Sequence, residues 1–237
     1  MFSSAETQLI YQVANAPIRV FPYPHILVHD ALPEEFYRGL RLHLPPDTAY
    51  KSPATVGMAG ENYPESRSIL PLTRAEISLL PEPYHSFWDE MAQWLLGGPF
   101  AHIFLQKFGP LLEQRFENPQ RLELRNEAMI VQDRTNFRLG PHTDARTKVL
   151  SLLLYLPADD TMPQLGTSMY VPRDPTFTCP GGRYHNFADF TRLATVPYVA
   201  NTLFAFMKTP NSFHGVEPVW EENVERALLL FDIRAAQ

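Results

Sequence analysis

The sequence Pro141-His142-Thr143-Asp144 stands just before a mostly apolar run at residues 149–156 (VLSLLLYL). In an extended strand, successive side chains point to opposite faces, so His142 and Asp144 point to one side and Thr143 to the other. An imidazole and a carboxylate that point the same way can bind one divalent metal ion together. The stretch therefore predicts a strand that begins next to a metal site.

A second histidine completes the candidate metal site. His214 lies in the segment 211–216 (NSFHGV), shortly after another apolar run at 203–207 (LFAFM). Two imidazoles and one carboxylate on one face of a metal ion leave positions open for a chelating cosubstrate and oxygen. We therefore expect His142, Asp144 and His214 to be the metal ligands and the catalytic centre of a redox enzyme that uses iron.

Composition restricts the classes of protein to consider. The chain has 237 residues, of which 45% are hydrophobic and 19% charged, as expected for a single globular domain over residues 1–237. Its 20 basic and 26 acidic residues give a net charge of −6. A nucleic-acid partner usually requires a basic face, so we expect none.

Localisation signals are also lacking in the sequence. The first residues, 1–6 (MFSSAE), do not have the basic and apolar regions of a secretory leader, and no run reaches the roughly 18 apolar residues of a membrane helix. Cys179 is the one cysteine, so no disulfide forms within the chain. With His185 it offers too few ligands for zinc. We expect a cytoplasmic protein with no membrane partner, and the sequence leaves the oligomeric state open.

The 23 prolines divide the chain into short elements, which favours an all-β or α+β fold. The helix-rich part, residues 1–120, is expected to contain an arm or helix at 1–17, a strand at 24–30, a helix at 33–44, a loop at 47–67, and helices at 73–80, 83–96 and 100–116, the last one interrupted near Gly109-Pro110. The part from about 121 to 237 is expected to contain strands at 121–133, 136–144, 148–156, 166–171, 191–206, 212–219 and 225–234, with an insertion at 172–190. Both long loops are candidate lids. We predict an α+β fold in which a double-stranded β-helix, or jelly roll, is buttressed by the N-terminal helices.

Three segments resemble the 2-oxoglutarate and Fe(II)-dependent dioxygenases, particularly their prolyl-hydroxylase-like branch. They are 136–144 (NFRLGPHTD), 152–157 (LLLYLP) and 214–219 (HGVEPV), within a similar region of about 125–234. The resemblance implies Fe(II), 2-oxoglutarate and O2 as cofactor and cosubstrates. It also implies oxidative decarboxylation of 2-oxoglutarate coupled to hydroxylation of an unactivated C–H bond.

Arg226 stands where the resemblance places the residue that binds the distal carboxylate of 2-oxoglutarate. It begins an apolar run at 227–231 (ALLLF), where a buried charge needs a partner, and a guanidinium matches a carboxylate with two hydrogen bonds. A salt bridge to Glu225 or Glu217 is the alternative. The supporting hydroxyl that the family often has two residues later is replaced by Leu228, so Tyr155 or Thr202 is expected to take its place in binding the cosubstrate.

The substrate is expected to be a small or carrier-tethered molecule. If strand alternation holds, Arg138, Lys208 and Ser212 face the site and Arg146 lies at its rim, which would suit an anionic substrate. The alternative for these residues is solvent exposure. Desaturation, cyclisation and epoxidation remain open as outcomes. Two other functions remain open as well: a cupin-like metalloenzyme that needs no cosubstrate, and a catalytically silent jelly-roll binding module.

Overall fold

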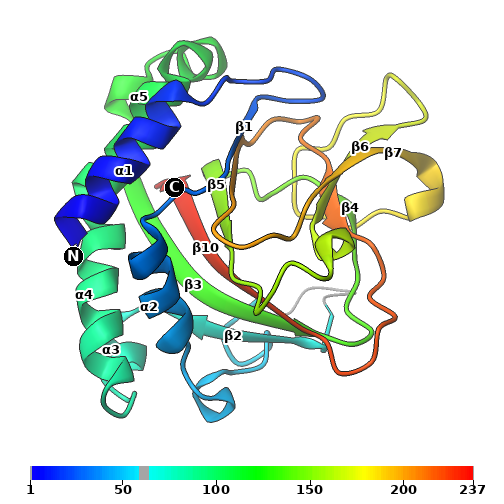
Figure 1. Ribbon diagram of the computed structural model, residues 1–237. Helices are drawn as coiled ribbons and strands as arrows, with labels where there is room; N and C mark the ends of the chain where they lie inside the picture. Colours follow the sequence, from blue (N-terminus) through cyan, green and yellow to red (C-terminus); the bar gives the residue numbers. More distant parts are fainter. Residues whose placement is uncertain (1, 59–63, 237) are drawn as a thin grey trace.

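The computed structural model describes residues 2–58 and 64–236. Two antiparallel sheets face each other, and helices cover the outside of the larger sheet (Figure 1). The larger sheet has the order β1-β8-β5-β10-β3-β2 and the smaller one β4-β9-β6-β7. The strands are β1 (His25–Val28), β2 (Arg67–Pro71), β3 (Leu124–Arg134), β4 (Leu139–His142), β5 (Lys148–Tyr155), β6 (Thr167–Pro172), β7 (Phe190–Val196), β8 (Leu203–Met207), β9 (His214–Val216) and β10 (Glu225–Ala235). The predicted α+β fold with a jelly-roll core is confirmed.

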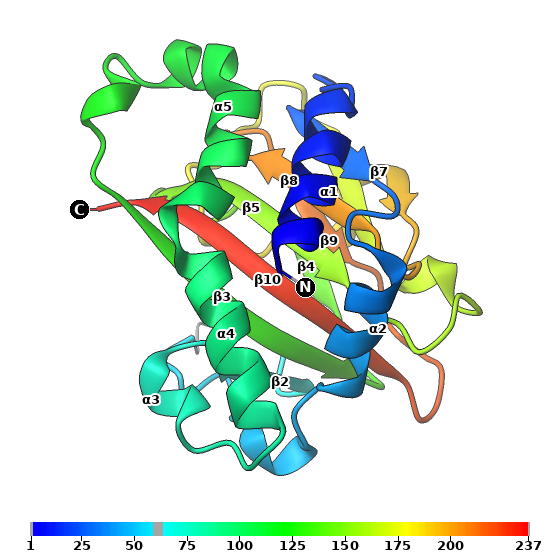
Figure 2. The same cartoon turned by 60° about the vertical axis from the view of Figure 1, so that its left-hand side comes forward.

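Helices from the N-terminal half lie across the outer face of β3, β5 and β10 (Figure 2). They are α1 (Phe2–Asn15), α2 (Glu34–Leu42), α3 (Arg74–Ile77), α4 (Tyr84–Leu96) and α5 (Gly98–Arg115). The N-terminal segment is thus a helix, and its Ala5, Leu9 and Val13 are buried at the spacing of one helical face. No helix in the described ranges is long and apolar enough to cross a membrane.

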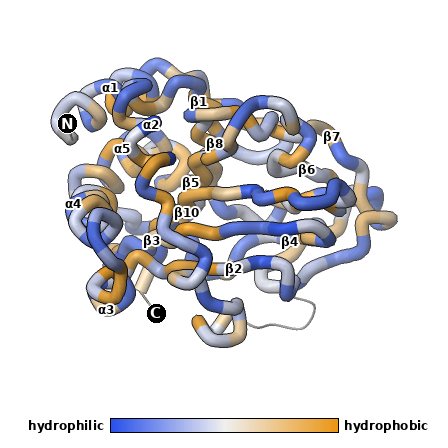
Figure 3. The backbone as a smooth tube through the Cα atoms, turned by 60° about the horizontal axis from the view of Figure 1, so that its bottom comes forward, coloured by the Kyte–Doolittle hydropathy of each residue, from blue (hydrophilic) through white to orange (hydrophobic). Residues whose placement is uncertain are grey.

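The strands of the larger sheet are buried on both faces. On β10 the odd-numbered side chains, such as Leu229 and Phe231, pack under the helices, while Leu228 packs in the cluster between the two sheets. Figure 3 shows hydrophobic stretches along β5 and β10 next to the helices. The even-numbered positions of β10 therefore point between the sheets, and they include the buried Arg226 and Asp232. One strand carries the helix-facing core on one side and charged groups on the other.

The prediction of one strand over 191–206 is wrong, because the structure has two strands in this range and they belong to different sheets. β7 pairs with β6 in the smaller sheet, and β8 pairs with β1 and β5 in the larger one. Pro197 lacks an N–H for a ladder, and Asn201 has a positive φ of 54°. The chain therefore leaves one sheet and enters the other between these two residues.

Two further expectations for the N-terminal half are corrected. The break predicted at Gly109-Pro110 does not occur, since α5 continues through Pro110 to Arg115. Phe104, Phe108 and Leu112, on either side of that position, are buried in the core, and this packing outweighs the backbone hydrogen bond that proline cannot make. The end of the predicted loop at 47–67 begins β2, which extends the larger sheet at its edge.

Candidate metal centre and its cavity

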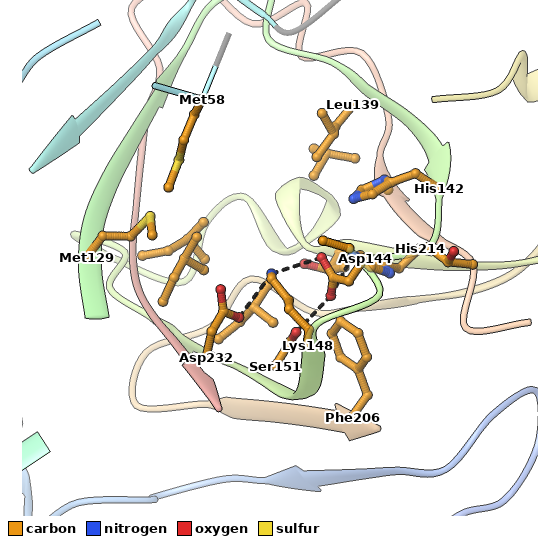
Figure 4. A pocket seen from close by; sticks show the side chains of 18 of the residues that line it. Met58, Met129, Leu139, His142, Asp144, Lys148, Ser151, Phe206, His214 and Asp232 are labelled. Atoms are coloured by element: carbon orange, nitrogen blue, oxygen red, sulfur yellow. Dashed lines mark hydrogen bonds and ion pairs between the residues drawn. The ribbon is translucent and has the colours of Figure 1, made fainter. Parts of the chain in front are cut away.

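A cavity of about 410 Å³ lies between the two sheets (Figure 4). Both long loops contribute to its wall, because Met58 from 47–67 and Gly182 and Tyr184 from 172–190 line it. Both loops were predicted as lids, and that role stays a prediction; residues 59–63 lie outside the described residues. Met129 and Leu139 add an apolar wall. The cavity is large enough for a small molecule.

The three predicted metal ligands meet in this cavity. The ligand atoms of His142, Asp144 and His214 all lie within 4.8 Å of one another, and all three residues are buried. His142 at the end of β4 is directly opposite His214 at the start of β9, with 4.3 Å between the ring centroids. A side chain at Gly215 would place its Cβ 2.5 Å from the carbonyl oxygen of Leu139, so glycine there permits the close approach of the two strands.

Backbone carbonyl groups fix the orientation of both imidazoles. Nδ1 of His142 donates to the carbonyl oxygen of Gly140, and Nδ1 of His214 to that of Ser212, each at 3.0 Å. Because the Nδ1 atoms carry the protons, the Nε2 atoms are left with lone pairs for a metal ion. Burial lowers the pKa of His142 to about 3 and also lowers the pKa of His214. Both rings are therefore neutral near pH 7, as ligands must be.

Asp144 receives a hydrogen bond on each oxygen. Lys148 Nζ donates to Oδ1 at 2.8 Å and Ser151 Oγ donates to Oδ2 at 2.7 Å. Burial alone would raise the pKa of Asp144, but Lys148 and the two histidines hold the pKa well below its usual value. Lys148 is held in turn by Asp232, 2.9 Å away, and the two carboxylates keep the pKa of Lys148 raised despite its burial. Sequence reasoning missed Lys148, Ser151 and Asp232.

The loop at 172–190 supports the backbone of Asp144. Thr143 is among the residues that line the cavity, and its hydroxyl donates to the carbonyl oxygen of Cys179 at 2.9 Å. Gly181 has a φ of +134°, and a Cβ there would lie 2.1 Å from the carbonyl oxygen of Asp144. The ring of Tyr184 lies 4.8 Å from that of His142. The donor set therefore fits a divalent iron, with two imidazole nitrogens and one carboxylate on one buried face.

Arg226 is 1% exposed and lines the same cavity. Its guanidinium donates to Asp133 Oδ2 at 2.6 Å, to the carbonyl oxygen of Leu165 and to Thr167 Oγ1 at 3.4 Å. The salt bridge of Arg226 is thus to Asp133, and not to Glu225 or Glu217, which were the alternative to a cosubstrate carboxylate. A buried carboxylate in β3 was not singled out in the sequence, because only the strand register reveals that it faces Arg226.

The hydroxyl group beside Arg226 is that of Thr167, which also lines the cavity. The Tyr155 hydroxyl accepts a hydrogen bond from the backbone N–H of Thr167 at 3.1 Å, and its ring centroid lies 6.0 Å from the Arg226 guanidinium carbon. Thr202 lies elsewhere, where its hydroxyl contacts His29 and donates to the carbonyl oxygen of Ala200. Sequence reasoning missed Thr167 because the turn before β6 gave no positional signal.

The four predicted substrate residues are not among those that line the cavity in the described part of the chain. Arg138 and Arg146 are exposed. Lys208 is buried and donates to Thr143 Oγ1 at 3.1 Å and to the carbonyl oxygen of Thr209, while Ser212 Oγ donates to that same carbonyl. The β4–β9 register shifts between Leu139 and His142, which breaks the alternation on which Arg138 depended.

Comparison with known proteins supports the fold. No family model and no curated protein matches the sequence. Many solved structures are similar to this chain, and the following three match nearly its whole length. A Pseudomonas putida prolyl-4-hydroxylase is 17% identical, with 97% of this chain and 100% of that chain covered and a TM-score of 0.52. An oxidoreductase of the 2OG-Fe(II) oxygenase family from Burkholderia pseudomallei is 13% identical, with coverage of 97% and 89% and a TM-score of 0.52. The non-heme alpha ketoglutarate dependent epimerase SnoN from nogalamycin biosynthesis is 13% identical, with coverage of 98% and 83% and a TM-score of 0.54.

Proposed function

We propose that this protein is an Fe(II)- and 2-oxoglutarate-dependent oxygenase that hydroxylates a C–H bond of a small or carrier-tethered substrate. The observation that carries the proposal is the buried set of His142, Asp144 and His214, with both imidazoles turned by backbone carbonyls so that Nε2 is available. The fold shared with the oxygenase structures supports it. The epimerase SnoN has a similar fold, so the fold alone does not determine the reaction, and hydroxylation is proposed as the outcome in this protein.

In this proposal, each group of residues in the cavity has a defined task. The two Nε2 atoms and one oxygen of Asp144 hold the iron, and Lys148 and Ser151 orient that carboxylate. Arg226 and Thr167 receive the distal carboxylate of 2-oxoglutarate. The iron, when bound, supplies activation of oxygen coupled to decarboxylation of the 2-oxo acid. The walls formed by Met58, Met129, Leu139 and Tyr184 exclude bulk water and position the substrate C–H bond.

The test is an anaerobic titration of the metal-free protein with Fe(II) and then with 2-oxoglutarate. We expect a visible charge-transfer band from the chelated 2-oxo acid, and its loss in Asp144→Ala with the far-UV circular dichroism retained. Metal binding without the band would favour the metalloenzyme that needs no cosubstrate. Absence of metal binding would favour the silent binding module. Succinate formation then identifies substrates in a screen of small molecules and carrier-bound groups.

A further inference from the structure

Arg67, Asp133 and Arg226 form a row across three neighbouring strands. In the register of β2, β3 and β10, Asp133 is directly opposite Arg67 on one side and Arg226 on the other. Cross-strand neighbours on one face are close enough for their side chains to interact. All three residues are buried, and both arginines line the cavity that holds the metal ligands. The row therefore belongs to the cavity wall.

Asp133 is held mainly by Arg67. Arg67 Nε donates to Oδ1 at 2.6 Å and Arg67 NH2 donates to Oδ2 at 2.9 Å, which is a two-pronged ion pair. The guanidinium of Arg67 also lies 4.6 Å from the ring centroid of Phe137, a contact that fixes its plane. Arg226 makes one hydrogen bond to the same carboxylate, through NH1. One negative charge is thus shared by two guanidinium groups.

Arg226 keeps hydrogen-bonding capacity toward the cavity. A guanidinium has five N–H bonds. Within the described residues, 2–58 and 64–236, Arg226 makes three hydrogen bonds. Nε donates to the carbonyl oxygen of Leu165, NH1 to Asp133 and NH2 to Thr167. Asp133 cannot neutralise both arginines, and its two-pronged pair with Arg67 orients its oxygens. Arg226 is thereby left with charge and with donors for a ligand carboxylate.

We infer that Arg67 is a positioning residue for the cosubstrate: by holding Asp133, it prevents this carboxylate from neutralising Arg226 and so makes Arg226 selective for a dicarboxylate 2-oxo acid. The inference rests on the proposed function. Without Arg67, Asp133 and Arg226 would form a one-to-one ion pair in a buried site, where opposite charges interact strongly. The distal carboxylate of 2-oxoglutarate would then have to compete with Asp133 for Arg226.

The experiment measures how tightly the Fe(II)-loaded protein binds two 2-oxo acids in the absence of oxygen. One is 2-oxoglutarate, and the other is 2-oxopentanoate, which has a methyl group in place of the distal carboxylate. In Arg67→Met we expect 2-oxoglutarate binding to weaken by about 10- to 100-fold, the effect of losing a hydrogen bond to a charged group. The dissociation constant of 2-oxopentanoate should stay within about twofold of the wild-type value, because this acid has no distal carboxylate for Arg226 to bind. Arg67→Lys, which keeps the charge, should show a smaller loss than Arg67→Met.

The double variant Arg67→Met/Asp133→Asn separates this role from simple support of the fold. It removes the competing carboxylate, so no ion pair compensates the charge of Arg226 and the affinity for 2-oxoglutarate should return toward that of the wild type. Circular dichroism of every variant checks folding. The inference is overturned if Arg67→Met binds 2-oxoglutarate like the wild type, if both 2-oxo acids weaken equally, or if the double variant remains as weak as Arg67→Met. Failure of the wild type itself to bind 2-oxoglutarate would instead overturn the proposed function.

Discussion

Acidification should destabilise the metal-free protein through its buried histidines, and His142 allows the size of the effect to be worked out. Burial lowers the pKa of His142 to about 3, whereas an unfolded histidine has a pKa of about 6.5. Between these two values the unfolded chain binds a proton that the folded chain does not. The free energy of unfolding therefore falls as the pH drops below about 6.5, and this loss continues toward pH 3.

From these two pKa values, proton linkage gives a contribution from His142 on the order of 1 kcal/mol at pH 5.5 and on the order of 2 kcal/mol at pH 5.0. His214 adds a loss of the same sign, since burial lowers its pKa as well. The assay is urea unfolding of the metal-free protein at pH 7.5, 6.5, 5.5 and 5.0. In His142→Gln, the loss of stability between pH 7.5 and 5.0 should be smaller than in the wild type by about 2 kcal/mol.

The control is His102→Gln, which replaces an exposed histidine on α5 and should leave the pH dependence of the wild type unchanged. Comparing the change with pH within each variant removes any constant effect of the substitution on stability. If His142→Gln loses as much stability on acidification as the wild type, His142 is not held neutral by burial and is not a preformed neutral ligand for a metal ion.

Two further substitutions test how the Asp144 ligand is supported. Ser151→Ala removes the hydrogen bond to Asp144 Oδ2 and should weaken Fe(II) or Mn(II) binding by about 10- to 100-fold in a metal titration, as is usual for groups that orient a ligand; unchanged affinity would show that Lys148 alone suffices. Gly181→Ala places a Cβ 2.1 Å from the carbonyl oxygen of Asp144, so the loop must shift. Metal binding should then be lost while the far-UV circular dichroism is retained. A metal affinity equal to that of the wild type would contradict the close packing of this loop against the backbone of Asp144.

The three candidate metal ligands meet in the structure, as the sequence led us to expect, because local rules decide where they lie. His142 and Asp144 lie two residues apart next to an apolar strand, and the segment around His214 has its own strand signal. Their meeting required only that the two strands pair, which the jelly-roll expectation supplied. The same reasoning failed for Arg138, because the irregularity between Leu139 and His142 resets the alternation. Such irregularities depend on tertiary packing and leave no local signal.

The row of Arg67, Asp133 and Arg226 was beyond sequence reasoning for a different reason. Arg67 and Asp133 are far apart in the chain, and nothing near either residue indicates that they face each other. Their meeting depends on the register of three strands, and a slip of one residue would turn each side chain to the opposite face. The available signal was weaker: Asp133 lies two residues after the apolar run 128–131 (AMIV) of β3, where an ionised group needs a partner.

Strand β10 shows why buried charges in apolar strands are informative. Its helix-facing residues form a continuous apolar core, and its other face has Arg226 near one end and Asp232 near the other. Each has an oppositely charged neighbour on an adjacent strand: Arg226 has Asp133, which it shares with Arg67, and Asp232 has Lys148. Replacing such pairs by apolar residues is often neutral or stabilising, so stability alone does not account for them. Both pairs border the cavity of the metal ligands, one of them bonded to Asp144 itself, and we attribute their presence to the chemistry of that cavity.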